Sequence, residues 1–202
     1  MLSVAKVLLL AFFDICRLQK RPQDIPESKN LLTLCLVFYG LLSVGLVMLS
    51  EPPDRAVLAG LLDVILIMAF TLALLQIRSK VGRWIQTVTA LTGTGIVLSL
   101  IALPIYVLLS FSGGSEASSN PIYGFGLLIL AGLAFWNVVI MAHILRHALD
   151  VNMLWGIILA IIYIWIVFSF TAAVMPMATD RTRRCARCAR APSRRLSSAW
   201  RR

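Results

Sequence analysis

The sequence predicts an all-α fold: a polytopic transmembrane helical bundle with five spans, preceded by an amphipathic helix at the membrane interface. The first observation behind this prediction is composition. The chain of 202 residues is 59% hydrophobic and only 14% charged, with a mean hydropathy of +0.88, which leaves too little polar surface for a soluble domain of this size. The second is a set of five apolar runs, each reaching the ~20 residues that a helix needs to cross about 30 Å of hydrocarbon. These runs cover residues 31–50, 56–77, 84–111, 122–145 and 151–175.

The backbone must satisfy its own hydrogen bonds inside a bilayer, so runs of this length are expected to be helices. They lack the alternation of apolar and polar residues that marks a membrane β-barrel. We therefore expect one five-helix domain over residues 31–177, with no separate soluble domain. Residues 22–30 form a linker in which Pro22 and Pro26 interrupt helix, and Ser28 or Asn30 can cap the first span.

Residues 1–21 have the pattern of an amphipathic helix. At 100° per residue, five polar residues of this segment fall within one sector of roughly 80°, in which Leu10 is the one apolar residue, and nine apolar residues lie around the rest of the helix. The segment is thus predicted to lie in the membrane interface, although a short sixth span is an alternative. No small-x-small cleavage site follows its apolar stretch, which argues against a signal peptide. The polar residues of the sector are Ser3, Lys6, Asp14, Arg17 and Arg21.

The distribution of basic residues predicts the orientation of the five spans. Five Lys or Arg residues precede the first span, three lie between the second and third, and one lies between the fourth and fifth. The two connections on the other side hold one and none. Because basic residues gather on the cytoplasmic side, this ratio of nine to one places the N-terminus in the cytoplasm. We expect a multi-pass protein of a bacterial cytoplasmic (inner) membrane.

Residues 178–202 form an Arg-rich tail that is predicted to be disordered. The net charge is +10, yet residues 1–179 carry ten basic and eight acidic residues (+2), so residues 180–202, with nine Arg and one Asp, supply the other +8. After five crossings such a tail would emerge on the side that basic residues avoid. Its Arg, Ala, Cys, Ser and Pro composition is typical of GC-rich DNA read in the wrong frame. We therefore interpret it as a frame change near residues 177–180. A basic tail that binds RNA or lipid is the alternative, but it would be more natural on the cytoplasmic side; we expect no nucleic-acid partner.

Asp63 is the only acidic residue within a predicted span, about seven residues, or roughly 10 Å, from the start of that span. An ionisable group at such depth is costly, so it is a candidate to bind a proton, a cation or a polar group of another helix. The alternative interpretation is purely structural: Asp63 lies near the positive end of its helix and reaches the lipid headgroups. The second interpretation is favoured because no charge partner is evident in the sequence.

A stripe of small and polar residues opens the third predicted span. Such residues let membrane helices approach closely, which is the favoured interpretation; a pore or substrate groove is the alternative. Asn137, in the middle of the fourth span, could bond to the third span or to Asp63, and Pro104 is expected to kink the third. The stripe comprises Gln86, Thr87, Thr89, Thr92, Gly93, Thr94, Gly95 and Ser99.

His143 and His147 lie four residues apart on one helical face, a spacing that can chelate a metal. A third ligand is not evident, and at a helix end these side chains also suit the dipole, so we predict no metal site. Cys16 and Cys35 are read as free thiols, and the Cys185–Cys188 pair of the tail carries no weight. Without a phosphate loop, a nucleophile elbow or paired carboxylates, we expect no enzyme and no cofactor.

The order of these parts resembles a known family. An amphipathic segment over residues 1–21, a proline-bearing linker from Pro22 to Pro26 and five closely spaced spans are similar to the Yip family of Rab-interacting, five-span membrane proteins, above all to its small bacterial relatives. In eukaryotes the resemblance implies vesicle traffic and binding of prenylated GTPases through a cytosolic N-terminal domain. We expect that domain to be absent here, and no functional residue transfers.

Two classes of function follow. The favoured one is a non-enzymatic, membrane-organising or partner-binding component, whose partners are the lipid bilayer, a second copy of the chain or other membrane proteins. The alternative is a small transporter or channel subunit that uses Asp63 and the polar face of the third span. An intramembrane metalloenzyme built on His143 and His147 is a remote third class.

Overall fold

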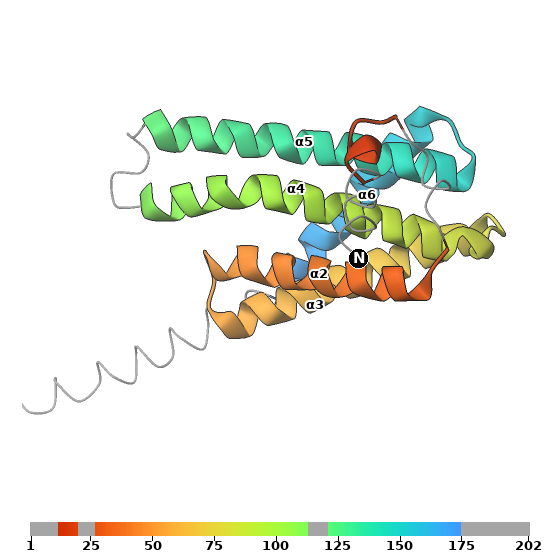
Figure 1. The fold of residues 1–202 in the computed structure, drawn as a ribbon, viewed down its shortest axis with the longest axis horizontal. Helices are drawn as coiled ribbons and strands as arrows, with labels where there is room; N and C mark the ends of the chain where they lie inside the picture. Colours follow the sequence, from red (N-terminus) through yellow and green to blue (C-terminus); the bar gives the residue numbers. More distant parts are fainter. Residues whose placement is uncertain (1–11, 20–26, 113–120, 175–202) are drawn as a thin grey trace, which may run out of the picture. The chain divides into compact units, whose positions relative to one another are not determined.

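A computed structural model describes residues 12–19, 27–112 and 121–174 of the chain (Figure 1). Within these ranges the structure is helical and contains no strand. Each of its five long helices is long and apolar enough to cross a membrane, which confirms the all-α class and a multi-pass membrane protein. The helices are α2 (Lys29–Met48), α3 (Pro53–Ile77), α4 (Trp84–Ser112), α5 (Pro121–Leu149) and α6 (Met153–Val174), with a short 3₁₀ turn, η2 (Val81–Arg83), before α4.

The helix boundaries differ from the predicted spans by a few residues. Ser28 caps α2, and its side chain accepts a hydrogen bond from the Leu31 amide at 3.4 Å. α3 begins at Pro53, three residues earlier than predicted. Proline suits the first position of a helix because its fixed φ is already helical and its missing N–H would have no partner there. At the other end of the bundle, α5 continues four residues past its predicted end, to Leu149.

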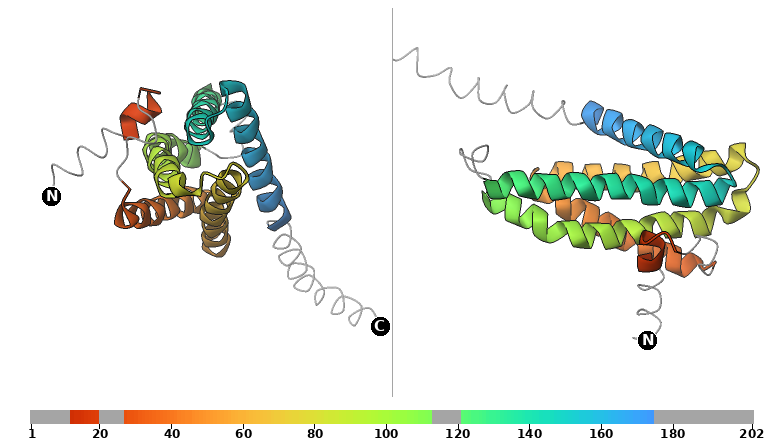
Figure 2. Two further views of the ribbon diagram at one scale, coloured as in Figure 1. Left: turned by 90° about the vertical axis from the view of Figure 1, so that its right-hand side faces the viewer. Right: turned by 90° about the horizontal axis from the view of Figure 1, so that it is seen from above.

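Contacts divide the chain into a unit spanning Met1–Trp165 and a second one from Ile166 onward, and the arrangement described here is that of the first. α4 packs against both α2 and α5, while α3 packs against α2 and α4 (Figures 1 and 2). Every residue of α4 from 87 to 94 is buried, so this part of α4 forms the centre of the core. Gly60 of α3 lies directly against Val44 of α2, which lets these two helices approach closely.

Ion pairs join two connections at one end of the bundle, which we call the basic end. Lys80 contacts the Asp150 carboxylate, and Arg83 Nη1 lies 3.0 Å from Asp150 Oδ2. The hydrogen bond from Lys80, with help from Arg83, holds the pKa of Asp150 below its usual range. The α3–α4 and α5–α6 connections, which charge counting assigned to one side of the membrane, thus lie together.

The described part of the N-terminal segment is a short helical stretch, residues 12–16, that packs against α4 and α5. Phe12, Ile15 and Cys16 are buried, and a Cβ atom at Gly93 of α4 would lie 2.3 Å from Phe12 Cε1. Trp136 Nε1 of α5 donates a hydrogen bond to the Cys16 carbonyl at 3.2 Å. The apolar side of this stretch therefore contacts protein, and its location at the membrane interface stays a prediction.

Several sequence predictions lie outside the described residues. These are the first half of the amphipathic segment, most of the proline-bearing linker and the whole Arg-rich tail with Cys185 and Cys188. The frame-change hypothesis and its rivals remain predictions.

Large apolar side chains are exposed along all five helices, as expected where lipid rather than water is the solvent.

Candidate functional site

Asp63 lies near the middle of α3. Because the helix begins at Pro53, Asp63 is ten residues, or about 15 Å, along a helix of 25 residues. The interpretation in which this carboxylate lies near the start of its helix and reaches the headgroups does not fit that position. Asp63 is therefore an ionisable side chain at depth, where its charge needs partners within the protein.

Three hydroxyl groups surround the Asp63 carboxylate. Tyr39 OH donates to Oδ2 at 2.7 Å, Ser43 Oγ donates to the same oxygen at 3.3 Å, and Tyr163 OH donates to Oδ1 at 3.3 Å. Tyr39 and Ser43 share a face of α2, one turn apart, whereas Tyr163 comes from α6. Among the described residues, no Lys or Arg side chain forms an ion pair with Asp63. The carboxylate thus links three helices through neutral donors alone.

Close packing holds the two tyrosines in place. A Cβ atom at Gly95 of α4 would lie only 2.6 Å from Tyr39 Cε2, so the absence of a side chain at Gly95 makes room for the Tyr39 ring. The Tyr163 ring packs on Phe70 of α3, with a centroid distance of 5.1 Å and an interplanar angle of 48°. Each hydroxyl is therefore directed at Asp63 by contacts on the ring that carries it.

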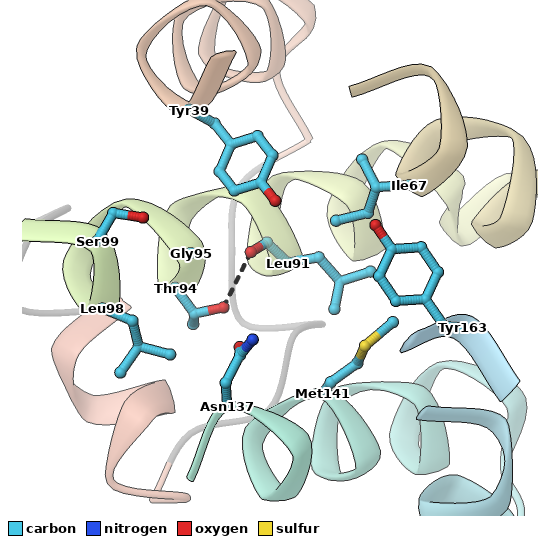
Figure 3. Close-up of a pocket in the computed structure, with 10 residues that line it drawn as sticks. All are labelled: Tyr39, Ile67, Leu91, Thr94, Gly95, Leu98, Ser99, Asn137, Met141 and Tyr163. Carbon is cyan, nitrogen blue, oxygen red and sulfur yellow. Dashed lines mark hydrogen bonds between the residues drawn. The ribbon is translucent and has the colours of Figure 1, made fainter. Parts of the chain in front are cut away.

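Tyr39 and Tyr163 also line a cavity of about 120 Å³ (Figure 3). Asp63 is not among the side chains that line it, but its carboxylate is hydrogen-bonded to two that do, Tyr39 and Tyr163. The lining comes from all five long helices: Tyr39, Ile67, Leu91, Thr94, Gly95, Leu98, Ser99, Asn137, Met141 and Tyr163.

The polar side chains of this lining differ in whether they have a hydrogen-bond partner within the protein. Thr94 Oγ1 lies 2.9 Å from the Ala90 carbonyl oxygen and 3.0 Å from that of Leu91, so its hydrogen is directed into its own helix. The side chains of Ser99 and Asn137 make no hydrogen bond with any residue that the structure describes. Ser99 is half-buried and Asn137 is exposed, so both side chains are accessible and can hydrogen-bond a polar occupant where they face the cavity. The cavity has room for several waters or one small solute.

The six candidate residues that the sequence suggested do not all lie at the cavity. Thr94 and Asn137 line the cavity, and Asp63 lies one layer behind it, whereas Gln86, Thr92 and His143 are not part of the lining. Asn137 does not bond to Asp63, whose described partners are all hydroxyl groups.

Sequence reasoning missed three members of the site, Tyr39, Ser43 and Tyr163. The sequence did contain an indication of them. Tyr39 and Ser43 carry hydroxyl groups one helical turn apart within the first apolar run, and Tyr163 carries a hydroxyl group within the last.

The threonine hydroxyl groups of the α4 stripe form hydrogen bonds with backbone carbonyls close to them in the chain. Thr87, Thr89 and Thr92 donate to carbonyls four residues earlier in the chain, at 2.8, 2.7 and 2.8 Å, as Thr94 also does. Such back-bonding removes the hydroxyl hydrogens from the helix surface. Because these threonines are buried at the centre of the core, they support close packing along the stripe rather than a continuous polar groove.

The two histidines contact each other outside the cavity. The His143 and His147 rings meet edge to face, with centroids 4.6 Å apart. In the described part of the chain, no group of three His, Cys, Asp or Glu residues could hold a metal ion. Cys16 and Cys35 are both buried free thiols.

The fold and this site define an integral, multi-pass membrane protein with a partly polar, partly open cavity among its helices. Comparison with known proteins adds no further identification: no family model, no curated protein and no solved structure matches the chain. The resemblance to five-span Yip proteins therefore stays a prediction.

Proposed function

We propose that this membrane protein binds a small polar solute or ion in the cavity beside Asp63 and passes it across the bilayer, as a small transporter or channel subunit. The observation that supports this function is the pair of polar side chains, Ser99 and Asn137, that face the cavity without a described hydrogen-bond partner. The hydroxyl of Ser99 and the amide of Asn137 retain hydrogen-bonding capacity that no described residue uses, so a polar solute in the cavity can bond to both.

The membrane-organising or partner-binding role has less support. Its motivation is the exposed apolar surface of the helices, and any helix in contact with lipid has such a surface. Association with a second copy, with other membrane proteins or with Yip-type partners therefore remains an expectation from the sequence, as does the absence of enzymatic activity.

We also propose a bacterial inner membrane as the location, with the basic end in the cytoplasm. Lys80 and Arg83 at that end support this orientation. In a background without native cysteines, Ser79→Cys at the basic end should react with an impermeant maleimide only from the cytoplasmic side. Ser50→Cys, in the α2–α3 connection, should react only from the outside. Labelling of both from the same side would contradict the proposed topology.

Flux measurements test the proposed function. The full chain, reconstituted into liposomes, should raise the permeability to at least one of a panel consisting of Na⁺, K⁺, methylammonium, chloride, urea and glycerol. Asn137→Leu, which replaces the amide with an apolar group of similar size, should reduce that flux about tenfold or more, because one hydrogen bond to a bound solute is lost and the cavity becomes apolar.

A matched pair of serines provides the control. Ser99→Ala removes a cavity hydroxyl and should reduce the flux, whereas Ser110→Ala removes an exposed hydroxyl of the same helix that bonds only to the Val107 carbonyl. Ser110→Ala should leave the flux unchanged. Permeability equal to that of empty liposomes for the whole panel would overturn the proposal and favour the scaffold.

A further inference from the structure

We propose that the occupant of the cavity is a small monovalent cation, either an alkali-metal ion or an ammonium-type ion. This inference rests on the proposed function and names the class of its substrate. It follows from the charge behind the cavity wall, from the direction of the hydroxyl hydrogens in that wall and from the number of carboxylates nearby.

The first step concerns charge. Asp63 is the only acidic residue in the described membrane-spanning helices away from their ends, and its described partners are three neutral hydroxyl groups. A carboxylate in a low-dielectric interior attracts a positive charge over several ångströms. The cavity lies directly beyond the Tyr39 and Tyr163 side chains, so a cation placed there would be held by this field.

The second step concerns hydrogens. A hydroxyl group has one hydrogen to donate and two lone pairs that accept. Tyr39 and Tyr163 donate their hydrogens to Asp63, and Thr94 directs its hydrogen to backbone carbonyls of α4. All three hydroxyl oxygens are therefore left with lone pairs and no hydrogen for the cavity. A wall of this kind suits a cation or an N–H donor and repels an anion.

The aromatic rings add to the same preference. The side chains of Tyr39 and Tyr163 reach the cavity from two different helices (Figure 3), and the face of a tyrosine ring attracts cations, ammonium ions included. Asn137 can turn its amide oxygen toward the occupant, since its oxygen and nitrogen are interchangeable by a half-turn of the amide.

The third step concerns valence. A single carboxylate neutralises one positive charge, and an unbalanced second charge would be costly in this interior. The described residues contain no cluster of acidic side chains of the kind that holds Ca²⁺ or Mg²⁺. The site therefore fits a monovalent cation better than a divalent one.

The flux panel separates this inference from the function on which it rests. We expect the wild-type chain to pass Na⁺, K⁺ or methylammonium in preference to chloride, urea and glycerol. Passage of methylammonium alone would identify the ammonium class, and passage of Na⁺ or K⁺ the alkali-metal class. Passage of urea, glycerol or chloride without any cation would overturn this inference and leave the proposed function standing. No passage of any probe would overturn both.

Two variants test the roles of the named groups. Asp63→Asn, which keeps the shape and removes the charge, should reduce cation flux about tenfold or more, the effect of losing one interaction with a charged group. Tyr163→Phe keeps both the ring and the Asp63 charge but removes an acceptor oxygen, so it should also reduce cation flux, and it serves if Asp63→Asn fails to fold. Ser110→Ala again provides the control. Cation flux that is unchanged in Asp63→Asn or, where that variant does not fold, in Tyr163→Phe would overturn the inference.

Discussion

Replacing Gly95 with alanine should break the contact that directs Tyr39 to Asp63. The new Cβ atom would lie 2.6 Å from Tyr39 Cε2 and 3.0 Å from Cδ2, while ordinary contacts begin at 3.4 Å. The ring must therefore move by about 0.8 Å, the difference between 3.4 and 2.6 Å. Tyr39 OH now lies 2.7 Å from Asp63 Oδ2, and a displacement of that size stretches the pair beyond the usual length of an O–H···O⁻ bond.

The expected cost combines three effects. Overpacking costs about 1–3 kcal/mol, and loss of a hydrogen bond to a charged group about 1.5–3 kcal/mol, whereas alanine gains about 1 kcal/mol over glycine within a helix. The free energy of unfolding of Gly95→Ala should therefore fall by roughly 1.5–5 kcal/mol.

A second glycine supplies a matched control. Gly45 lies in α2, and a Cβ atom there would have no neighbour within 4 Å. Gly45→Ala should leave the protein unchanged or stabilise it by up to about 1 kcal/mol. Both variants can be unfolded by titrating SDS into micelles of a mild detergent, with tryptophan fluorescence as the readout.

The double variant isolates the Tyr39 ring as the cause. In a Tyr39→Leu background, Gly95→Ala should cost little, because the ring that it displaces is gone. Equal stability of Gly95→Ala and Gly45→Ala in the chain that retains Tyr39 would refute the reasoning.

Three further predictions concern other parts of the bundle. Gly156→Ala would place a Cβ atom 2.5 Å from the Ala142 carbonyl oxygen, so it should speed hydrogen exchange in the first turns of α6. Asp150 has a lowered pKa in the folded chain, so its contribution to stability is present above the usual carboxylate pKa and is lost as the pH falls through the lowered value. The difference in unfolding free energy between wild type and Asp150→Asn should therefore disappear in acid, and it should shrink at high salt concentration. Burial raises the pKa of the Cys16 thiol to about 11, so a maleimide should label it slowly at neutral pH, as mass spectrometry can measure.

The fold was predictable because bilayer physics allows few alternatives. Five apolar runs of sufficient length correspond to α2 through α6, and one boundary error lies at the start of α3, where the apolar run begins at Ala56 but the helix begins at Pro53. That error had a consequence for the site. A helix that began at Ala56 would place Asp63 seven residues from its start, whereas the start at Pro53 places it ten residues in, near the middle of the 25-residue helix.

The partners of Asp63 could not be predicted, because the sequence does not fix the rotation of each helix about its axis. In a soluble protein the apolar stripe faces the core, but in a membrane both lipid and core are apolar, so the stripe carries little information. Tyr39 and Tyr163 come from the first and last spans, and which faces of these helices meet depends on close contacts such as that between Gly95 and Tyr39.

Threonine and asparagine within a span carry different amounts of information about function. A threonine hydroxyl can bond to the carbonyl four residues earlier, as Thr89 and Thr92 do, and its hydrogen-bonding capacity is then used within its own helix. A carboxamide has two N–H donors and one carbonyl acceptor, more than a single helix turn readily satisfies, so an asparagine at depth needs groups from elsewhere. Asn137 has no described protein partner and faces a cavity. The conspicuous stripe of hydroxyls is thus explained by helix packing, and the single amide is the stronger indication of a bound solute.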